Sequence, residues 1–291
     1  MTFRTLVDVA TLAAHRADPA WRLVDCRFDL ADPRAGEAAY AAGHVPGAVY
    51  AHLDRDLSAP RTPQSGRHPL PEPAALAATF SRLGIDAGIQ VVAYDDAGGC
   101  HAARLWWLLR WLGHEAAAVL DGGLPAWRAA GQPLATEVPA IVPRRFVPRL
   151  AAHAAVDAAA LDALLASRAV VLLDARAPER FEGRIEPLDP QAGHVPGARN
   201  HPYVRNLAPD GRFLPAAELR ARLLERLAGR RPEAAVSMCG SGVTACHTLL
   251  ALEIAGLPGA RLYPGSWSEW CRDPARPVAT GPEPAASEAP R

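Results

Sequence analysis

The sequence predicts an α/β fold built twice in tandem, with each copy a mostly parallel sheet flanked by helices. Three observations support this: motifs that recur in the same order, short apolar runs typical of buried strands, and helical patterns that alternate with those runs. The chain has 291 residues, which suits two domains of ordinary size, about 100–200 residues each.

The duplication is visible as paired motifs. The pairs are GHVPGA at 43–48 and 193–198, LVDCR at 23–27 and LLDAR at 172–176, and DGGLPAW at 121–127 and YPGSWSEW at 263–270. Matches in constant order with small changes of spacing indicate a duplicated domain with loops of different length. Between the copies, residues 131–149 contain several prolines and no helical periodicity. We therefore predict domains at 1–134 and 154–280, a linker at 135–153 and a disordered tail at 281–291.

The apolar runs predict strands in both copies, and they are continuous rather than alternating, as expected for strands buried on both faces of a parallel sheet. The predicted strands are 21–26, 90–95 and 117–120 in the first copy and 170–174, 234–238 and 260–263 in the second. The predicted helices are 74–83, 101–112, 157–166, 215–228 and 245–255.

The composition excludes several classes of function. Basic and acidic residues number 31 each, so the chain lacks the positive charge of a nucleic-acid binder. There is no apolar run of about 18 residues that could span a membrane. The N-terminus lacks the apolar stretch of a signal peptide. We therefore expect a cytoplasmic protein with no nucleic-acid or membrane partner.

The cysteines do not predict a disulfide framework or a metal site. There are five, and none forms a C-x-x-C pair: Cys26, Cys100, Cys239, Cys246 and Cys271. An odd number without zinc spacing indicates free thiols in a reducing compartment. Most buried cysteines behave as small apolar residues, so only sequence context can single one out as reactive.

Cys239 has such a context. It follows the predicted strand 234–238 and opens the loop CGSGVT, which leads into a predicted helix from 245. In open α/β sheets, ligands bind beyond the carboxyl ends of the strands. Gly240 and Gly242 allow the loop to turn its N–H groups inward, and these groups with the helix dipole favour a thiolate. We predict that Cys239 is a nucleophile.

Two other functions fit a cysteine in a glycine-rich loop less well. A Cys-dependent phosphatase needs an arginine at the end of the loop to pair the phosphate, but Thr244 and Ala245 stand there. A non-catalytic binding module would not need the intact loop. A P-loop is excluded because the loop lacks its lysine pattern.

The loop CGSGVTA, the two copies of GHVPGA and the terminal GSWSEW resemble the tandem-rhodanese sulfurtransferases, over essentially residues 5–278. The match is closest to the 3-mercaptopyruvate branch, whose loop is typically CGSGVT, whereas the thiosulfate branch usually has basic residues after the cysteine. This resemblance implies that the second domain is catalytic. It also implies substrate contacts from the loop residues Gly240, Gly242, Val243 and Thr244.

The resemblance further implies that Ser241 works with His68 and Asp54 from the first half, although Asp56 could be aligned in place of Asp54. Arg180 matches an arginine that binds the donor carboxylate. The family often has a second arginine before the second GH-x-PG, but residues 186–190 read EPLDP here, so it is missing from its expected place.

The first copy has lost the nucleophile. Aligning the copies through their terminal Trp residues places Asp96 opposite Cys239 and Cys100 opposite Val243. His44 and His194 stand at the same position of the GHVPGA motif, one in each copy. Because this histidine is present with and without the nucleophile, we predict that it anchors a loop.

We expect a sulfurtransferase without metal or organic cofactor, which moves a sulfane sulfur from 3-mercaptopyruvate through a Cys239 persulfide. The expected partners are a small-molecule sulfur donor and an acceptor, which is either cyanide or a thiol such as that of a thioredoxin-like protein. The alternative is a thiosulfate:cyanide sulfurtransferase.

Overall fold

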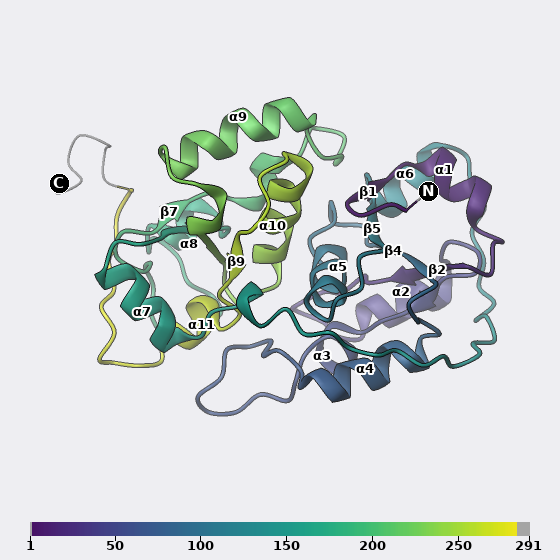
Figure 1. Ribbon diagram of the computed structural model, residues 1–291, viewed down its shortest axis with the longest axis horizontal. Helices are drawn as coiled ribbons and strands as arrows, with labels where there is room; N and C mark the ends of the chain where they lie inside the picture. Colours follow the sequence, from purple (N-terminus) through teal and green to yellow (C-terminus); the bar gives the residue numbers. More distant parts are fainter. Residues whose placement is uncertain (1, 284–291) are drawn as a thin grey trace. The chain divides into compact units, whose positions relative to one another are not determined.

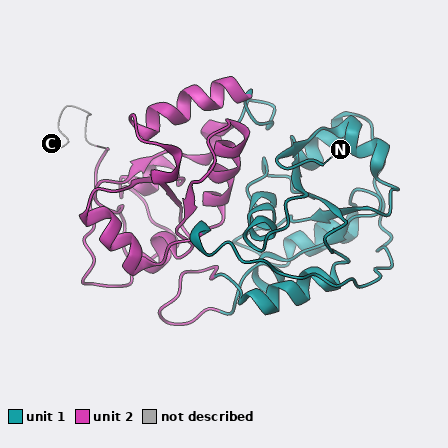
Figure 2. Ribbon diagram, in the orientation of Figure 1, with its two compact units in different colours: residues 1–60, 70–154, 207–215 teal, residues 61–69, 155–206, 216–291 magenta. Residues whose placement is uncertain are grey.

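The computed structural model describes residues 2–283, so Met1 and residues 284–291, which make up most of the predicted tail, lie outside the described part. The chain divides into two compact units (Figure 2). Unit 1 comprises Met1–Pro60, Leu70–Ala154 and Leu207–Pro215, and unit 2 comprises Arg61–Pro69, Ala155–Asn206 and Ala216–Arg291. The short segment Arg61–Pro69 therefore belongs to unit 2, although the sequence places it within the first copy.

Unit 1 contains a parallel sheet with the strand order β1-β5-β4-β2-β3 (Figure 1). Its strands are β1 (Leu6–Val7), β2 (Trp21–Asp25), β3 (Val49–Tyr50), β4 (Gln90–Tyr94) and β5 (Ala117–Leu120). Its helices are α1 (Val9–His15), α2 (Ala35–Ala42), α3 (Leu53–Asp56), α4 (Pro73–Arg82), α5 (Ala102–Trp111) and α6 (Gly123–Ala129). Val92 and Tyr94 pack with Leu12 and Trp127 in one core cluster. Val91 and Ala93, which alternate with them along β4, are also buried, which explains the continuous apolar run.

Unit 2 contains a parallel sheet with the order β7-β6-β8-β9. Its strands are β6 (Val171–Asp174), β7 (Arg199–Asn200), β8 (Ala235–Met238) and β9 (Arg261–Leu262). Its α-helices are α7 (Ala158–Ala166), α8 (Pro178–Phe181), α9 (Ala216–Leu227), α10 (Thr244–Ile254) and α11 (Ser266–Trp270). Val236 and Met238 of β8 pack with Trp267 and Trp270 in its core.

The predicted α/β class, with a parallel sheet in each copy, is confirmed. Each predicted strand and helix is present, with boundaries that differ by one residue at most. The sequence did not reveal β1, β3 and β7, which are two residues long and too short to show a period. Short helices such as α3 and α8, four residues each, were missed for the same reason.

The repeated motifs meet around one buried ion pair in each unit. In unit 1, Arg27 Nη2 donates to Asp25 Oδ2 at 2.6 Å and to the carbonyl of Gly43 at 2.8 Å. In unit 2, Arg176 Nη2 makes the same two bonds, to Asp174 at 2.7 Å and to Gly193 at 2.8 Å. The Asp-x-Arg motif therefore fastens the GHVPGA turn to the end of the neighbouring strand.

The two repeated histidines anchor this turn. His44 Nδ1 lies 2.8 Å from the carbonyl of Tyr40 and its ring stacks on that tyrosine. His194 Nδ1 lies 2.8 Å from the carbonyl of Phe181 and its ring stacks on that phenylalanine. Both imidazoles are buried and held on two sides, as a structural role requires.

The segment predicted as a linker is extended and packs closely against unit 1. Residues 136–151 contain no helix or strand. The N–H of Arg144 donates to Ser81 at 2.9 Å, the N–H of Arg149 donates to Leu112 at 2.8 Å, and Phe146 is buried. Across residues 2–283, no helix is both long and apolar enough to cross a membrane.

Candidate active site

Cys239 is the first residue after β8, and its thiol lies inside the loop that leads to α10. Cys239 Sγ accepts the N–H of Gly242 at 3.1 Å and the N–H of Ser241 at 3.5 Å. Gly242 has a φ of +76°, and a Cβ there would lie 2.4 Å from the carbonyl oxygen of Pro264. A side chain at residue 242 would therefore prevent the curl that aims these N–H groups at the sulfur.

The terminal motif GSWSEW holds the backbone of this loop. The N–H of Cys239 donates to Ser266 Oγ at 3.0 Å. In return, the N–H groups of Trp267 and Ser268 donate to the carbonyls of Cys239 and Gly240, both at 2.9 Å. These bonds fix the backbone of Cys239 and Gly240. The motif was recognised in the sequence, but its contact with the Cys239 loop was not, because the sequence does not show which loop α11 packs against.

His68 and Ser241 form a hydrogen-bonded pair next to Cys239. His68 Nδ1 lies 2.7 Å from Ser241 Oγ, and both side chains are buried, with His68 only 1% exposed. The imidazole can thus orient the hydroxyl of Ser241, which stands two residues after Cys239 in the loop. Thr244 begins α10 and Val243 precedes it as the N-terminal cap residue.

Asp54 lies in unit 1, in the first turn of α3, and is half-buried. The alternative, Asp56, is occupied: its Oδ2 accepts the N–H of His52 at 2.9 Å and its Oδ1 pairs with Arg82 at 2.7 Å. Both carboxylate oxygens of Asp56 are therefore engaged within unit 1.

Arg180 is part of a buried ion network in front of the Cys239 loop. Its Nη2 donates to Glu186 Oε1 at 2.6 Å and to Asp189 Oδ2 at 3.2 Å. Arg176 lies 3.6 Å from Glu186. Burial alone would lower the pKa of Arg176, but the neighbouring acidic groups, Asp174 foremost and Glu186 with it, together raise the pKa, so this guanidinium remains charged beside the loop.

Two further residues, Arg67 and Asp189, belong to this network, and the sequence had not singled them out as site residues. Arg67 forms an ion pair with Asp189, and Asp189 stands in the stretch that lacks the expected second arginine. Arg184, which stands next to that stretch in the sequence, instead pairs with Glu182 at 2.6 Å and is 57% exposed. Arg184 is therefore directed away from the buried network.

The other cysteines differ from Cys239. Burial raises the pKa of the Cys26 thiol well above its usual value and raises that of Cys271 to about 11. Cys246 Sγ donates to the carbonyl of Gly242 at 3.3 Å, so it supports the loop as a thiol. None of the five cysteines forms a disulfide, and all five are buried.

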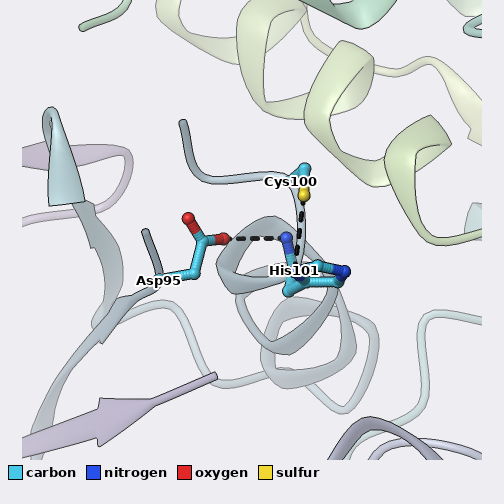
Figure 3. A group of neighbouring side chains, drawn as sticks. All are labelled: Asp95, Cys100 and His101. Carbon is cyan, nitrogen blue, oxygen red and sulfur yellow. Dashed lines mark hydrogen bonds between the residues drawn. The ribbon is translucent and has the colours of Figure 1, made fainter. Parts of the chain in front are cut away.

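The corresponding loop of unit 1 holds a carboxylate where unit 2 has the thiol. Strand register pairs Asp25 with Tyr94 and Asp174 with Met238, so Asp95, and not Asp96, corresponds to Cys239. The prediction of Asp96 was wrong because it was counted back from the terminal Trp residues, and unit 1 has one more residue than unit 2 between this position and that Trp. The structure places Asp95 beside the start of α5, with its carboxylate directed at the N–H of His101 (Figure 3).

The carboxylate of Asp95 accepts hydrogen bonds from four backbone N–H groups of this loop and the start of α5. Its Oδ1 accepts the N–H groups of Ala97 at 2.9 Å and Gly99 at 2.8 Å, and its Oδ2 accepts those of His101 at 2.8 Å and Ala102 at 2.9 Å. Cys100 and His101 lie close to it. However, a carboxylate already bonded to four N–H groups is arranged as an internal anion and not as a metal ligand.

We expect Asp95→Ala to destabilise the protein by about 3 kcal/mol or more, because four N–H groups lose a charged acceptor inside the protein. Chemical denaturation monitored by circular dichroism measures the change. The matched control is Asp96→Ala, at the exposed neighbour, for which a change within about 0.5 kcal/mol is expected. Equal stabilities of the two variants would show that Asp95 does not hold the loop.

Comparison with known proteins identifies the repeated unit. The rhodanese-like domain matches residues 8–130 and again residues 157–273. A protein of Pseudomonas aeruginosa called "Probable 3-mercaptopyruvate sulfurtransferase" is 50% identical over 97% of this chain and 100% of its own. A Mycobacterium tuberculosis protein called "Putative thiosulfate sulfurtransferase SseB" is 43% identical over 96% of this chain and 98% of its own.

Solved structures agree with the sequence relatives. The crystal structure of SseA from Escherichia coli, described as a 3-mercaptopyruvate sulfotransferase, superposes with a TM-score of 0.79 at 31% identity. That match covers 92% of this chain and 100% of the SseA chain. The 3-mercaptopyruvate sulfurtransferase of Leishmania major superposes with a TM-score of 0.80 at 32% identity, over 92% of this chain and 74% of that one.

Proposed function

Since the chain belongs to the rhodanese family, with two rhodanese-like domains, we propose that it is a sulfurtransferase in which Cys239 carries the sulfur as a persulfide. The support is the cradle of N–H groups around Cys239 Sγ. Such a cradle stabilises a thiolate before the reaction and the terminal sulfur anion of a persulfide after it. Within the described residues, the corresponding position of unit 1 holds Asp95, which cannot accept sulfur.

The proposed donor is 3-mercaptopyruvate, and the observation that carries this choice is the 2.7 Å contact between His68 and Ser241. The Cys239 thiolate attacks the donor sulfur, so that an S–S bond forms while the C–S bond breaks. The electron pair of the C–S bond passes to the carbon and carbonyl oxygen of the leaving group as an enolate. The enolate takes up the proton that the donor thiol has lost and leaves as pyruvate.

Ser241 is proposed to stabilise the enolate oxygen by donating a hydrogen bond, with His68 orienting the hydroxyl. An oriented donor aimed at developing charge is worth most in a site from which water is excluded, and both side chains are buried. Asp54 is proposed to support His68, as the family resemblance implies. Arg180 is proposed to bind the donor carboxylate, and Gly240, Gly242, Val243 and Thr244 are proposed to form the wall around the sulfur.

An acceptor thiol or cyanide would then attack the outer sulfur and release the Cys239 thiolate. This cycle consumes no electrons from outside and requires no metal or organic cofactor. We propose that the acceptor is cyanide or a thiol, and that the thiol can belong to a thioredoxin-like protein. Free thiols throughout the chain support a reducing compartment, and we propose the cytoplasm.

Thiosulfate is the second candidate donor. It is favoured by the arginines beside the loop, because a dianionic donor benefits from fixed cations, and by the 43% identical relative named for thiosulfate. The test is kcat/KM for both donors with cyanide as acceptor, with a phosphatase substrate as blank. We expect the larger value for 3-mercaptopyruvate. A larger value for thiosulfate would reverse the assignment, and turnover of neither would reject the sulfurtransferase.

A further inference from the structure

Resting on the proposed function, we infer that Arg67 is a donor-binding residue, the second cation of the carboxylate site at Cys239. The position of Gly240 carries this inference. An ideal Cβ on Gly240 would lie 2.7 Å from Arg67 Nη2 and 3.3 Å from Arg180 Nη1. The two guanidinium groups thus fill the space where any other residue next to the nucleophile would place its side chain.

Arg67 is held in this position by backbone and side-chain contacts. Its N–H donates to Ser268 Oγ at 3.0 Å, and Ser268 belongs to the helix that also binds the carbonyl of Gly240. The preceding residue packs as closely, because a Cβ on Gly66 would lie 2.5 Å from the carbonyl oxygen of Gly265. The Arg67 backbone and the catalytic loop are therefore fixed to the same helix, α11.

The arginine side chains keep hydrogen-bonding capacity toward the loop. Arg67 is 9% exposed, its Nη1 pairs with Asp189, and its buried Nε has no acceptor among the described residues. Arg180 uses Nε and Nη2 for Glu186 and Asp189, and its Nη1 is the atom that approaches Gly240. Asp189 contacts both arginines and so holds the two guanidinium groups side by side.

The stretch EPLDP at residues 186–190 lacks the second arginine of the family. The arrangement of Arg67 and Arg180 explains how the chain can still bind an anionic donor. A carboxylate held by two planar guanidinium groups is fixed in orientation as well as in position. The donor carbon chain would then extend from the arginines toward Cys239 and Ser241. The cation is supplied by the segment Arg61–Pro69, which also supplies His68.

The test compares alkylation of Cys239 by iodoacetate, a carboxylate, and by iodoacetamide, its neutral analogue. Rates are measured by mass spectrometry of the Cys239 peptide in the full-length chain. Arg67→Gln should lower the iodoacetate-to-iodoacetamide rate ratio about tenfold, the value of one charge-assisted contact. Arg67→Lys, which retains a point charge, should give an intermediate ratio. Arg184→Gln, at the exposed arginine, should leave the ratio unchanged.

In steady-state assays with 3-mercaptopyruvate, Arg67→Gln should raise KM at least about tenfold while kcat changes less, because the lost contact is made to the bound donor. A merely structural role would slow both alkylating agents equally and lower kcat. An unchanged alkylation ratio in both Arg67→Gln and Arg67→Lys would overturn the inference. The alkylation ratio needs no sulfur transfer, so it tests Arg67 even if the proposed donor is wrong.

Discussion

Replacing Cys239 by Ala is expected to abolish sulfur transfer, with a loss of roughly 10⁴-fold or more in kcat for either donor. The reason is that the Cys239 sulfur lies at the end of β8, where the N–H groups of Ser241 and Gly242 are directed at it. Intact-mass measurement after incubation with the donor should show one additional sulfur atom on the wild type and none on Cys239→Ala.

The matched control is Cys271→Ala. Cys271 is also free and buried in unit 2, but burial raises the pKa of its thiol to about 11, which keeps it protonated at neutral pH. Cys100→Ala is the equivalent control in unit 1. Both variants should retain turnover and take up the sulfur. Peptide mapping that located the added sulfur on either control cysteine would contradict the assignment of Cys239.

The two loops differ in the side chain that their N–H groups contact. Both loops direct N–H groups at the side chain that follows the strand, which is Asp95 in unit 1 and Cys239 in unit 2. The carboxylate engages four N–H groups, whereas the sulfur engages two. This difference fits the proposal that only the unit 2 loop takes part in sulfur transfer, while the unit 1 loop is held by its own carboxylate.

Sequence reasoning predicted the features that depend on local pattern. The buried strand before Cys239, the loop glycines and the helix after it are contiguous in the chain, so their arrangement follows from propensity and periodicity. The duplication also predicted two parallel sheets. The correspondence of Asp96 with Cys239 failed because it was measured from a motif downstream of a loop whose length differs between the copies.

Contacts between distant segments could not be predicted in this way. The sequence showed that the second arginine was absent from residues 186–190, but nothing in it showed that Arg67 lies against Gly240. That approach depends on the packing of Gly66 against α11 and on the ion pair with Asp189. The one indication available was the adjacency of Arg67 to His68, which the family resemblance had already linked to the site.

Ser241→Ala is expected to separate the two donors. With 3-mercaptopyruvate, kcat should fall about 100-fold or more, because an enolate leaving group loses the hydrogen-bond donor aimed at its oxygen. With thiosulfate the fall should be less than about tenfold, since sulfite leaves with its charge already spread over three oxygens and needs cations more than a proton donor. Stopped-flow formation of the persulfide with each donor measures both values.

His68→Ala is the companion variant for this test. Because His68 lies 2.7 Å from Ser241 Oγ, it should act through the serine, and the double variant should lose little more than either single change. Near-additive losses would show that the two side chains work independently. Equal losses for both donors in Ser241→Ala would show that the hydroxyl supports the loop and not the enolate. The preference for 3-mercaptopyruvate would then need another cause, and the arginines beside Gly240 would favour thiosulfate.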